Sequence, residues 1–88
     1  MRHSHDFVPR HVGDELVLVP VTGQAADLEN VFTLNAVGAR IWQLAAKLPD
    51  EGQIARGLVE EYEVDEATAL SDVQEVLGQL KQIGAIVD

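Results

Sequence analysis

Cysteine is absent from this chain of 88 residues, which excludes disulfide bonds, thiolate metal sites and cysteine nucleophiles. Long apolar runs are absent too, and none approaches the roughly 20 residues of a membrane-spanning helix. Residues 1–6 lack the apolar core of a signal peptide. The sequence therefore predicts one domain over residues 1–88 that is cytoplasmic and has no membrane partner.

Basic residues are scarce: 6 Lys and Arg against 15 Asp and Glu give a formal net charge of -9. No basic residue occurs between Arg56 and Lys81, a stretch rich in acidic residues. These acids can simply solvate the surfaces of helices. Nucleic-acid binding, however, depends largely on Lys and Arg that neutralise phosphates, so we expect no nucleic acid among the partners.

The combinations of residues that catalysis requires are missing as well. The seven glycines form no phosphate-binding cluster, and Glu60 and Glu61 are adjacent helix positions that point in different directions. His3 and His5 have the spacing of two metal ligands on one strand face, but they lie in residues 1–6, which we expect to be a flexible tail. We therefore predict no enzyme activity, no cofactor and no metal site.

Short strands are expected in the first part of the chain. Alternating and β-branched residues predict strands over residues 7–12, 15–21 and 30–34, with a polar loop over residues 24–29. Pro9 favours an edge position for the first strand. Because the links are too short for helical crossovers, the strands should form a three-stranded antiparallel sheet.

Three helices follow, since apolar residues recur at helical spacing over residues 36–48, 51–62 and 66–83. Their expected N-caps are Asn35, Asp50 and Asp65, and their expected stops include Pro49 and Gly84. The expected buried positions are Val37, Ile41, Leu44, Ala45 and Leu48 in the first helix, Ile54, Leu58, Val59 and Tyr62 in the second, and Ala69, Val73, Val76, Leu80 and Ile83 in the third.

This order of elements predicts an α+β fold of the winged helix-turn-helix type, in which the last two helices form the pair and the strands form the wing. Trp42, the only tryptophan, either closes the edge of the core, the interpretation we favour, or anchors a partner. Strand exchange into a homodimer also stays open for so small a sheet.

The segment that runs from the third strand into the first helix suggests a binding site. If this strand lies at the edge of the sheet, its unpaired N–H and C=O groups can accept an extended peptide as an added strand. A line of residues beside the core stripe of the third helix would form the opposite wall; the alternative is an ordinary protected edge and rim. The candidate peptide-binding residues are Val31, Phe32, Thr33, Leu34, Leu70, Gln74, Leu77 and Lys81.

The same segment carries a resemblance. Residues 31–44 resemble the signature of the PqqD family, in which an aromatic residue, Leu and Asn, here Phe32, Leu34 and Asn35, precede the first helix. The acidic-Tyr pair Glu61-Tyr62 and the stop at Gly84 are similar to later parts of the family pattern.

The resemblance implies a non-catalytic peptide chaperone, a RiPP recognition element. Such domains bind the leader of a ribosomally made precursor peptide against the third strand and third helix, and present it to a modifying enzyme, often a radical S-adenosylmethionine protein. Residues 47–52 and 83–87 depart from the members that act in pyrroloquinoline quinone synthesis, so we expect another peptide or enzyme. The alternatives are a winged-helix DNA-binding regulator and a structural partner domain of an enzyme.

Overall fold

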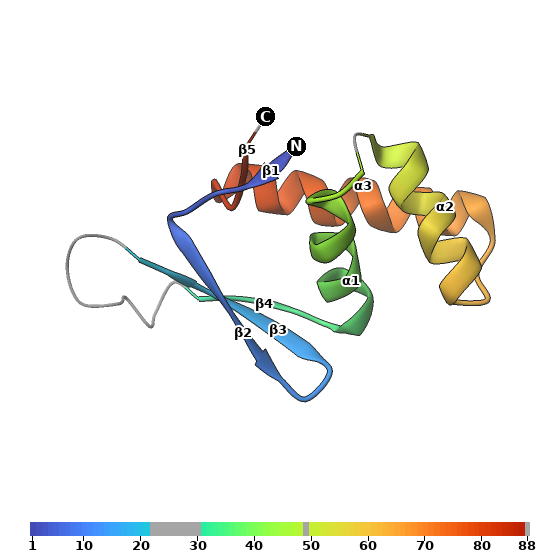
Figure 1. Ribbon diagram of the computed structural model, residues 1–88. Helices are drawn as coiled ribbons and strands as arrows, with labels where there is room; N and C mark the ends of the chain where they lie inside the picture. Colours follow the sequence, from blue (N-terminus) through green and yellow to red (C-terminus); the bar gives the residue numbers. More distant parts are fainter. Residues whose placement is uncertain (22–30, 49, 88) are drawn as a thin grey trace.

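The computed structural model describes residues 1–21, 31–48 and 50–87 (Figure 1). The elements, in chain order, are β1 Arg2–His3, β2 Phe7–Val12, β3 Glu15–Pro20, β4 Phe32–Leu34, α1 Ala36–Ala45, α2 Glu51–Glu61, α3 Glu66–Gln82 and β5 Ile86–Val87. Three expected features lie outside the described residues: the loop over residues 24–29, the first residue of the strand over residues 30–34, and the helix stop at Pro49.

The central sheet is an antiparallel meander in the order β2-β3-β4. β3 lies in the middle, pairing with β2 from Phe7↔Pro20 to Val12↔Glu15 and with β4 from Leu16↔Leu34 to Leu18↔Phe32. Both β2 and β4 are therefore edge strands within the described part of the chain. The three-stranded antiparallel sheet followed by three helices confirms the expected α+β architecture.

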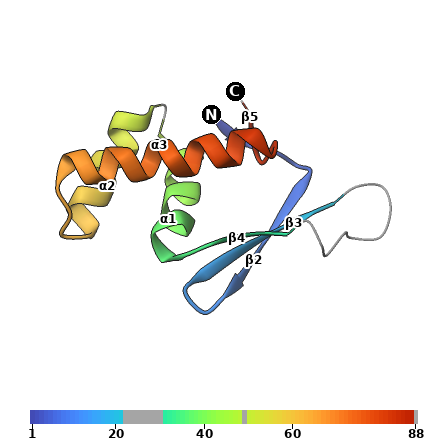
Figure 2. The ribbon, with the colours of Figure 1, turned by 180° about the vertical axis from the view of Figure 1, so that it is seen from behind.

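One face of this sheet carries the core. Leu16 and Leu18 of β3 and Leu34 of β4 are buried, and they belong to the same apolar cluster as buried side chains of all three helices. Figures 1 and 2 show the helices gathered on one side of the sheet, with α1 between the sheet and α3. The short β4 thus leads straight into the helix that joins the two layers.

Side-chain caps fix where the helices begin, as the sequence predicts. Asn35 Oδ1 accepts from the Gly38 N–H at 2.9 Å, and Asp50 and Asp65 cap α2 and α3 in the same way. The hydrogen bond from the Thr68 N–H lowers the pKa of the Asp65 carboxyl. At the other end of α3, Gly84 has φ +81°, the left-handed conformation expected of a C-terminal glycine.

The helices differ from the expected ones in two respects. α1 ends at Ala45 rather than at residue 48, because the next backbone N–H groups form tighter turns onto Gln43 and Leu44. The buried stripe of α3 consists of Ala69, Val73, Leu77 and Leu80. Ile83 is 37% exposed, so its assignment to the core was wrong. The other expected core residues that are only half-buried, while packing against the core, are Val37, Leu48, Val59, Tyr62 and Val76.

The two ends of the chain meet in a small second sheet. β1 pairs antiparallel with β5, joining His3 to Ile86. The ring of His3 stacks on Trp42 with centroids 3.5 Å apart, and its Nε2 donates to the Trp42 carbonyl at 2.6 Å. Trp42 is 4% exposed, which confirms its packing role. Arg2 and His3, which lie in the segment expected to be a flexible tail, are therefore paired with β5, and His3 also packs on Trp42.

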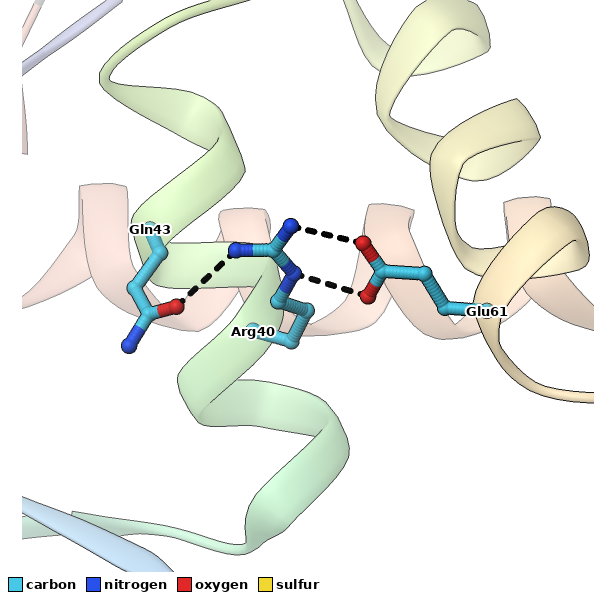
Figure 3. Close-up of polar contacts among 3 residues, drawn as sticks. All are labelled: Arg40, Gln43 and Glu61. Carbon is cyan, nitrogen blue, oxygen red and sulfur yellow. Dashed lines mark hydrogen bonds and ion pairs between the residues drawn. The ribbon is translucent and has the colours of Figure 1, made fainter.

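An ion pair joins α1 to the end of α2 (Figure 3). Arg40 donates from Nε and Nη2 to the two carboxylate oxygens of Glu61, at 2.8 and 2.6 Å, and from Nη1 to Gln43 Oε1 at 3.0 Å. The hydrogen bond from Arg40 holds the pKa of Glu61 below the ordinary value of 4.5. Since the pair is partly exposed, we expect it to contribute less than about 1 kcal/mol.

Replacing Glu61 by Gln should lower the free energy of unfolding at pH 7 by up to about 1 kcal/mol, because a neutral amide replaces the charged acceptor. The pKa of Glu61 is lower in the folded state, so its contribution is complete above pH 4.5 and disappears as the pH falls through the lower folded value. Urea unfolding at pH 7 and pH 3 should thus show a difference between wild type and variant that shrinks in acid. The matched control is Glu60→Gln; a difference that persists at pH 3 contradicts this account.

Two glycines inside helices should respond oppositely to a methyl group. A Cβ on Gly78 of α3 would meet nothing within 4 Å, so Gly78→Ala should raise the free energy of unfolding by about 0.5–1 kcal/mol. A Cβ on Gly38 would lie 3.1 Å from Leu34 Cδ2 and 3.2 Å from Leu34 Cβ, and Leu34 is fixed in the core. Gly38→Ala should therefore lower it. Equal stabilisation by both changes, measured by urea unfolding, would refute the close approach.

Candidate functional site

The hydrogen-bond alternation in the sheet determines which backbone groups of β4 are free. In an antiparallel pair, both polar groups of one residue point to the same neighbour, and successive residues alternate. Just beyond the β2–β3 ladder, the Val21 N–H donates to the Asp6 carbonyl at 2.7 Å. The backbone N–H and C=O groups of the odd-numbered residues of β3 therefore point to β2, and those of Leu16 and Leu18 point to β4.

This alternation leaves the backbone N–H and C=O groups in the middle of β4 without a partner strand on the outer side. By this alternation, the Leu16↔Leu34 and Leu18↔Phe32 pairs are the hydrogen-bonded ones, and the Val17↔Thr33 pair between them is not hydrogen-bonded. Thr33 thus directs both its N–H and its C=O away from the sheet. Its side chain is exposed as well. Within the described residues no strand lies on this side of β4, so Thr33 is an open position for pairing.

A groove of about 300 Å³ lies beside this open edge. It is formed by the end of β4, the first turn of α1 and one edge of α3. Its lining residues are Thr33, Leu34, Asn35, Val37, Gly38, Asp72, Glu75, Val76 and Gln79. The groove therefore adjoins the one residue of β4 whose outward backbone groups can pair with an added strand.

The chemistry of the groove is mixed. Leu34, Val37 and Val76 supply apolar surface, while two carboxylates, Asp72 and Glu75, stand on the α3 side. No lining residue is basic. Such a site can accommodate an extended chain with apolar side chains, and it repels anionic groups such as nucleic-acid phosphates.

Two of the four strand residues of the predicted site lie at the groove. Thr33 and Leu34 line the groove. Phe32 is half-buried against the core, and Val31 is 36% exposed beside the start of the strand without lining the groove. The expected alternation is present: Val31 and Thr33 are exposed, and Phe32 and Leu34 point inward.

The structure places the four residues of the predicted α3 wall away from the groove. None of Leu70, Gln74, Leu77 and Lys81 lines the groove, and Leu77 is a core residue with 1% exposure. Successive helix residues are about 100° apart around the helix axis. Val76 and Leu77 therefore lie on opposite sides of Val73, which is at the centre of the buried stripe of α3. The four residues of the predicted wall lie on or beyond the Leu77 side, and the groove lies on the Val76 side. Placing Leu77 rather than Val76 in the core would have predicted which edge of α3 lines the groove.

The described residues contain no group of three or more His, Asp or Glu side chains that could hold a metal ion, so His3 and His5 gain no further ligand there. In the same ranges, no helix has both the length and the apolar character of a membrane span. The features left to explain are the open edge of β4 and the groove beside it.

Known proteins resemble this chain in sequence and in fold. None of the curated proteins matches the sequence. Among solved structures, the chain is similar to "TbiB1 in Complex with the TbiA(beta) Leader Peptide", with 30% identity, a TM-score of 0.78 and coverage of 100% of both chains. The family model described as "Coenzyme PQQ synthesis protein D (PqqD)" matches residues 15–86, which include β3, β4, all three helices and the whole groove. The chain therefore belongs to the PqqD family.

Proposed function

We propose that this chain is a peptide-binding recognition domain of the RiPP type. In this function it binds the leader segment of a ribosomally made precursor peptide and presents the peptide to a modifying enzyme. The observation that carries the proposal is the outward-facing N–H and C=O of Thr33 beside the groove. Support comes from the leader peptide in the similar structure of TbiB1.

Strand addition accounts for both affinity and selectivity at such an edge. A peptide residue opposite Thr33 would exchange two backbone hydrogen bonds with it, each contributing about 0.5–1.5 kcal/mol net. The side chains on either side of that residue would point to the same face as Phe32 and Leu34, and so towards the groove. Backbone pairing accepts any sequence, while the groove selects among side chains.

The modification itself is assigned to the partner enzyme, which in this family is often a radical S-adenosylmethionine protein. The recognition domain would supply binding and position. The formal net charge of -9 and the two carboxylates in the groove argue against the alternative of a DNA-binding regulator. A purely structural docking domain would leave the peptide untouched, and variants of the β4 edge separate that role from the proposed one.

Thr33→Pro tests the edge directly, because proline removes the outward N–H and places a ring at the pairing position. We expect it to weaken binding of a labelled leader peptide by about tenfold or more, which corresponds to roughly 1.4 kcal/mol. The probes are the leader segments of short peptide genes that neighbour this chain's gene, and the measurement is fluorescence anisotropy.

The matched control is His11→Pro on β2. By the same alternation, the N–H of His11 points outward from β2, at the edge of the sheet opposite to β4. Pro9 occupies an equivalent outward-facing position on β2 and has no N–H. His11→Pro should bind as wild type does. Circular dichroism must show that both variants fold; a folded Thr33→Pro variant with unchanged affinity would rule out strand addition at β4.

The position of the helix wall has its own test. Gln79 and Gln74 are both exposed on α3, but only Gln79 lines the groove. A tryptophan at position 79 should obstruct the groove and weaken leader binding by about tenfold, whereas Gln74→Trp should leave binding unchanged. If Gln74→Trp is the damaging variant, the peptide lies along the other flank of α3, and the groove assignment fails.

A further inference from the structure

The charges in the groove point to a more specific ligand. Resting on the proposed function, we infer that the peptide which pairs with β4 carries a Lys or Arg against Asp72 and Glu75. An apolar residue two positions away along the peptide would contact Leu34, Val37 and Val76. The substrate class is thus an extended leader with one basic and one apolar side chain on the same face.

Asp72 and Glu75 are unmatched charges. They lie three positions apart on α3, which makes them neighbours on the helix surface, and like charges at this spacing destabilise each other. No lining residue of the groove is basic, and the ion pair found among the described residues, Arg40–Glu61, joins α1 to α2. Lys81, the basic residue nearest the end of α3, belongs to the opposite flank. A cation brought by the peptide would relieve the repulsion.

The dimensions fit two inward-pointing side chains. The helix wall from Asp72 to Gln79 covers seven residue steps, or about 10 Å, which matches roughly three residues of an extended strand. When one peptide residue pairs with Thr33, its two neighbours point into the groove, about 7 Å apart. One can cover the apolar surface while the other reaches the carboxylates.

Apolar and acidic peptides fit the charges of the groove less well than a peptide with a basic side chain. A wholly apolar peptide would cover Asp72, which is already half-buried, and remove water from its charge without replacement. An acidic side chain would meet two charges of its own sign. Lys and Arg combine an aliphatic stem with a charged end, so they can extend over the apolar surface and still reach the carboxylates.

Selection from a random library tests the preference even while the natural peptide is unidentified. Phage that display random 12-residue peptides are selected on the wild-type chain, with Thr33→Pro as the counter-selection. We expect the enriched peptides to carry a Lys or Arg two positions from an apolar residue. Enriched peptides that depend on Thr33 but show no such basic residue would overturn the inference and leave the proposed function standing.

Charge variants supply the quantitative measurement. An enriched peptide and its Lys→norleucine analogue are each titrated against three proteins: wild type, the groove variant Asp72→Asn/Glu75→Gln, and the control variant Glu60→Gln/Glu63→Gln. The control variant removes the same amount of charge at positions outside the groove. The Lys peptide should lose roughly threefold to tenfold in affinity with the groove variant alone, and the norleucine analogue should not discriminate. Equal losses with both variants would mean long-range attraction rather than contact, and would refute the assignment.

The two levels of failure are distinguishable. If no enriched peptide depends on Thr33, strand addition at β4 is wrong, and the charge preference falls with it. If peptides depend on Thr33 yet bind the Asp72→Asn/Glu75→Gln variant as tightly as wild type, only the inference on charge is wrong. Thermal unfolding of each variant ensures that a loss of binding is not a loss of fold.

Discussion

The passage from β4 into α1 through Asn35 is the constraint on which the rest of the site depends. The side chain of Asn35 accepts from the Gly38 N–H, and its carbonyl accepts from the Ala39 N–H, so the helix begins directly after the strand. Gly38 allows this first turn to lie against Leu34. β4 is consequently short and held at one end, and among the described residues its outer edge lies beside the groove and pairs with no further strand.

Features encoded by neighbouring residues could be predicted from the sequence. The three N-caps, the glycine at the end of α3 and the strand–Asn–helix segment depend on contacts within a few positions, and each is present. The antiparallel meander followed from the short links, and the edge position of its third strand, which the sequence left as a condition, is present in the described sheet. The pairing of His3 with Ile86 and the stacking of His3 on Trp42 could not be predicted, because no local pattern records which distant residues meet.

The error on α3 has a single physical origin. Apolar residues cover a wide arc of this helix, with Val76 and Leu77 on opposite sides of Val73, and the spacing alone does not decide which of them is buried. The decision is made by packing: Leu77 enters the core, and Val76 turns towards the groove beside β4. Because Leu77 and not Val76 is buried, the edge of α3 that lies beside β4 is the one with Asp72 and Gln79, and not the one with Leu70 and Lys81. The sequence therefore predicts a strand that lies at the groove together with a helix edge that lies away from it.

An open strand edge is also a place where two copies of a chain can pair, and the groove charges bear on this. Pairing β4 with β4 of a second copy would bring two sets of Asp72 and Glu75 together, in a chain whose formal net charge is already -9. Electrostatic repulsion opposes that arrangement, whereas a basic peptide lowers it. The same carboxylates thus oppose pairing of two β4 edges, and in the proposed function they would favour a cationic strand at this edge.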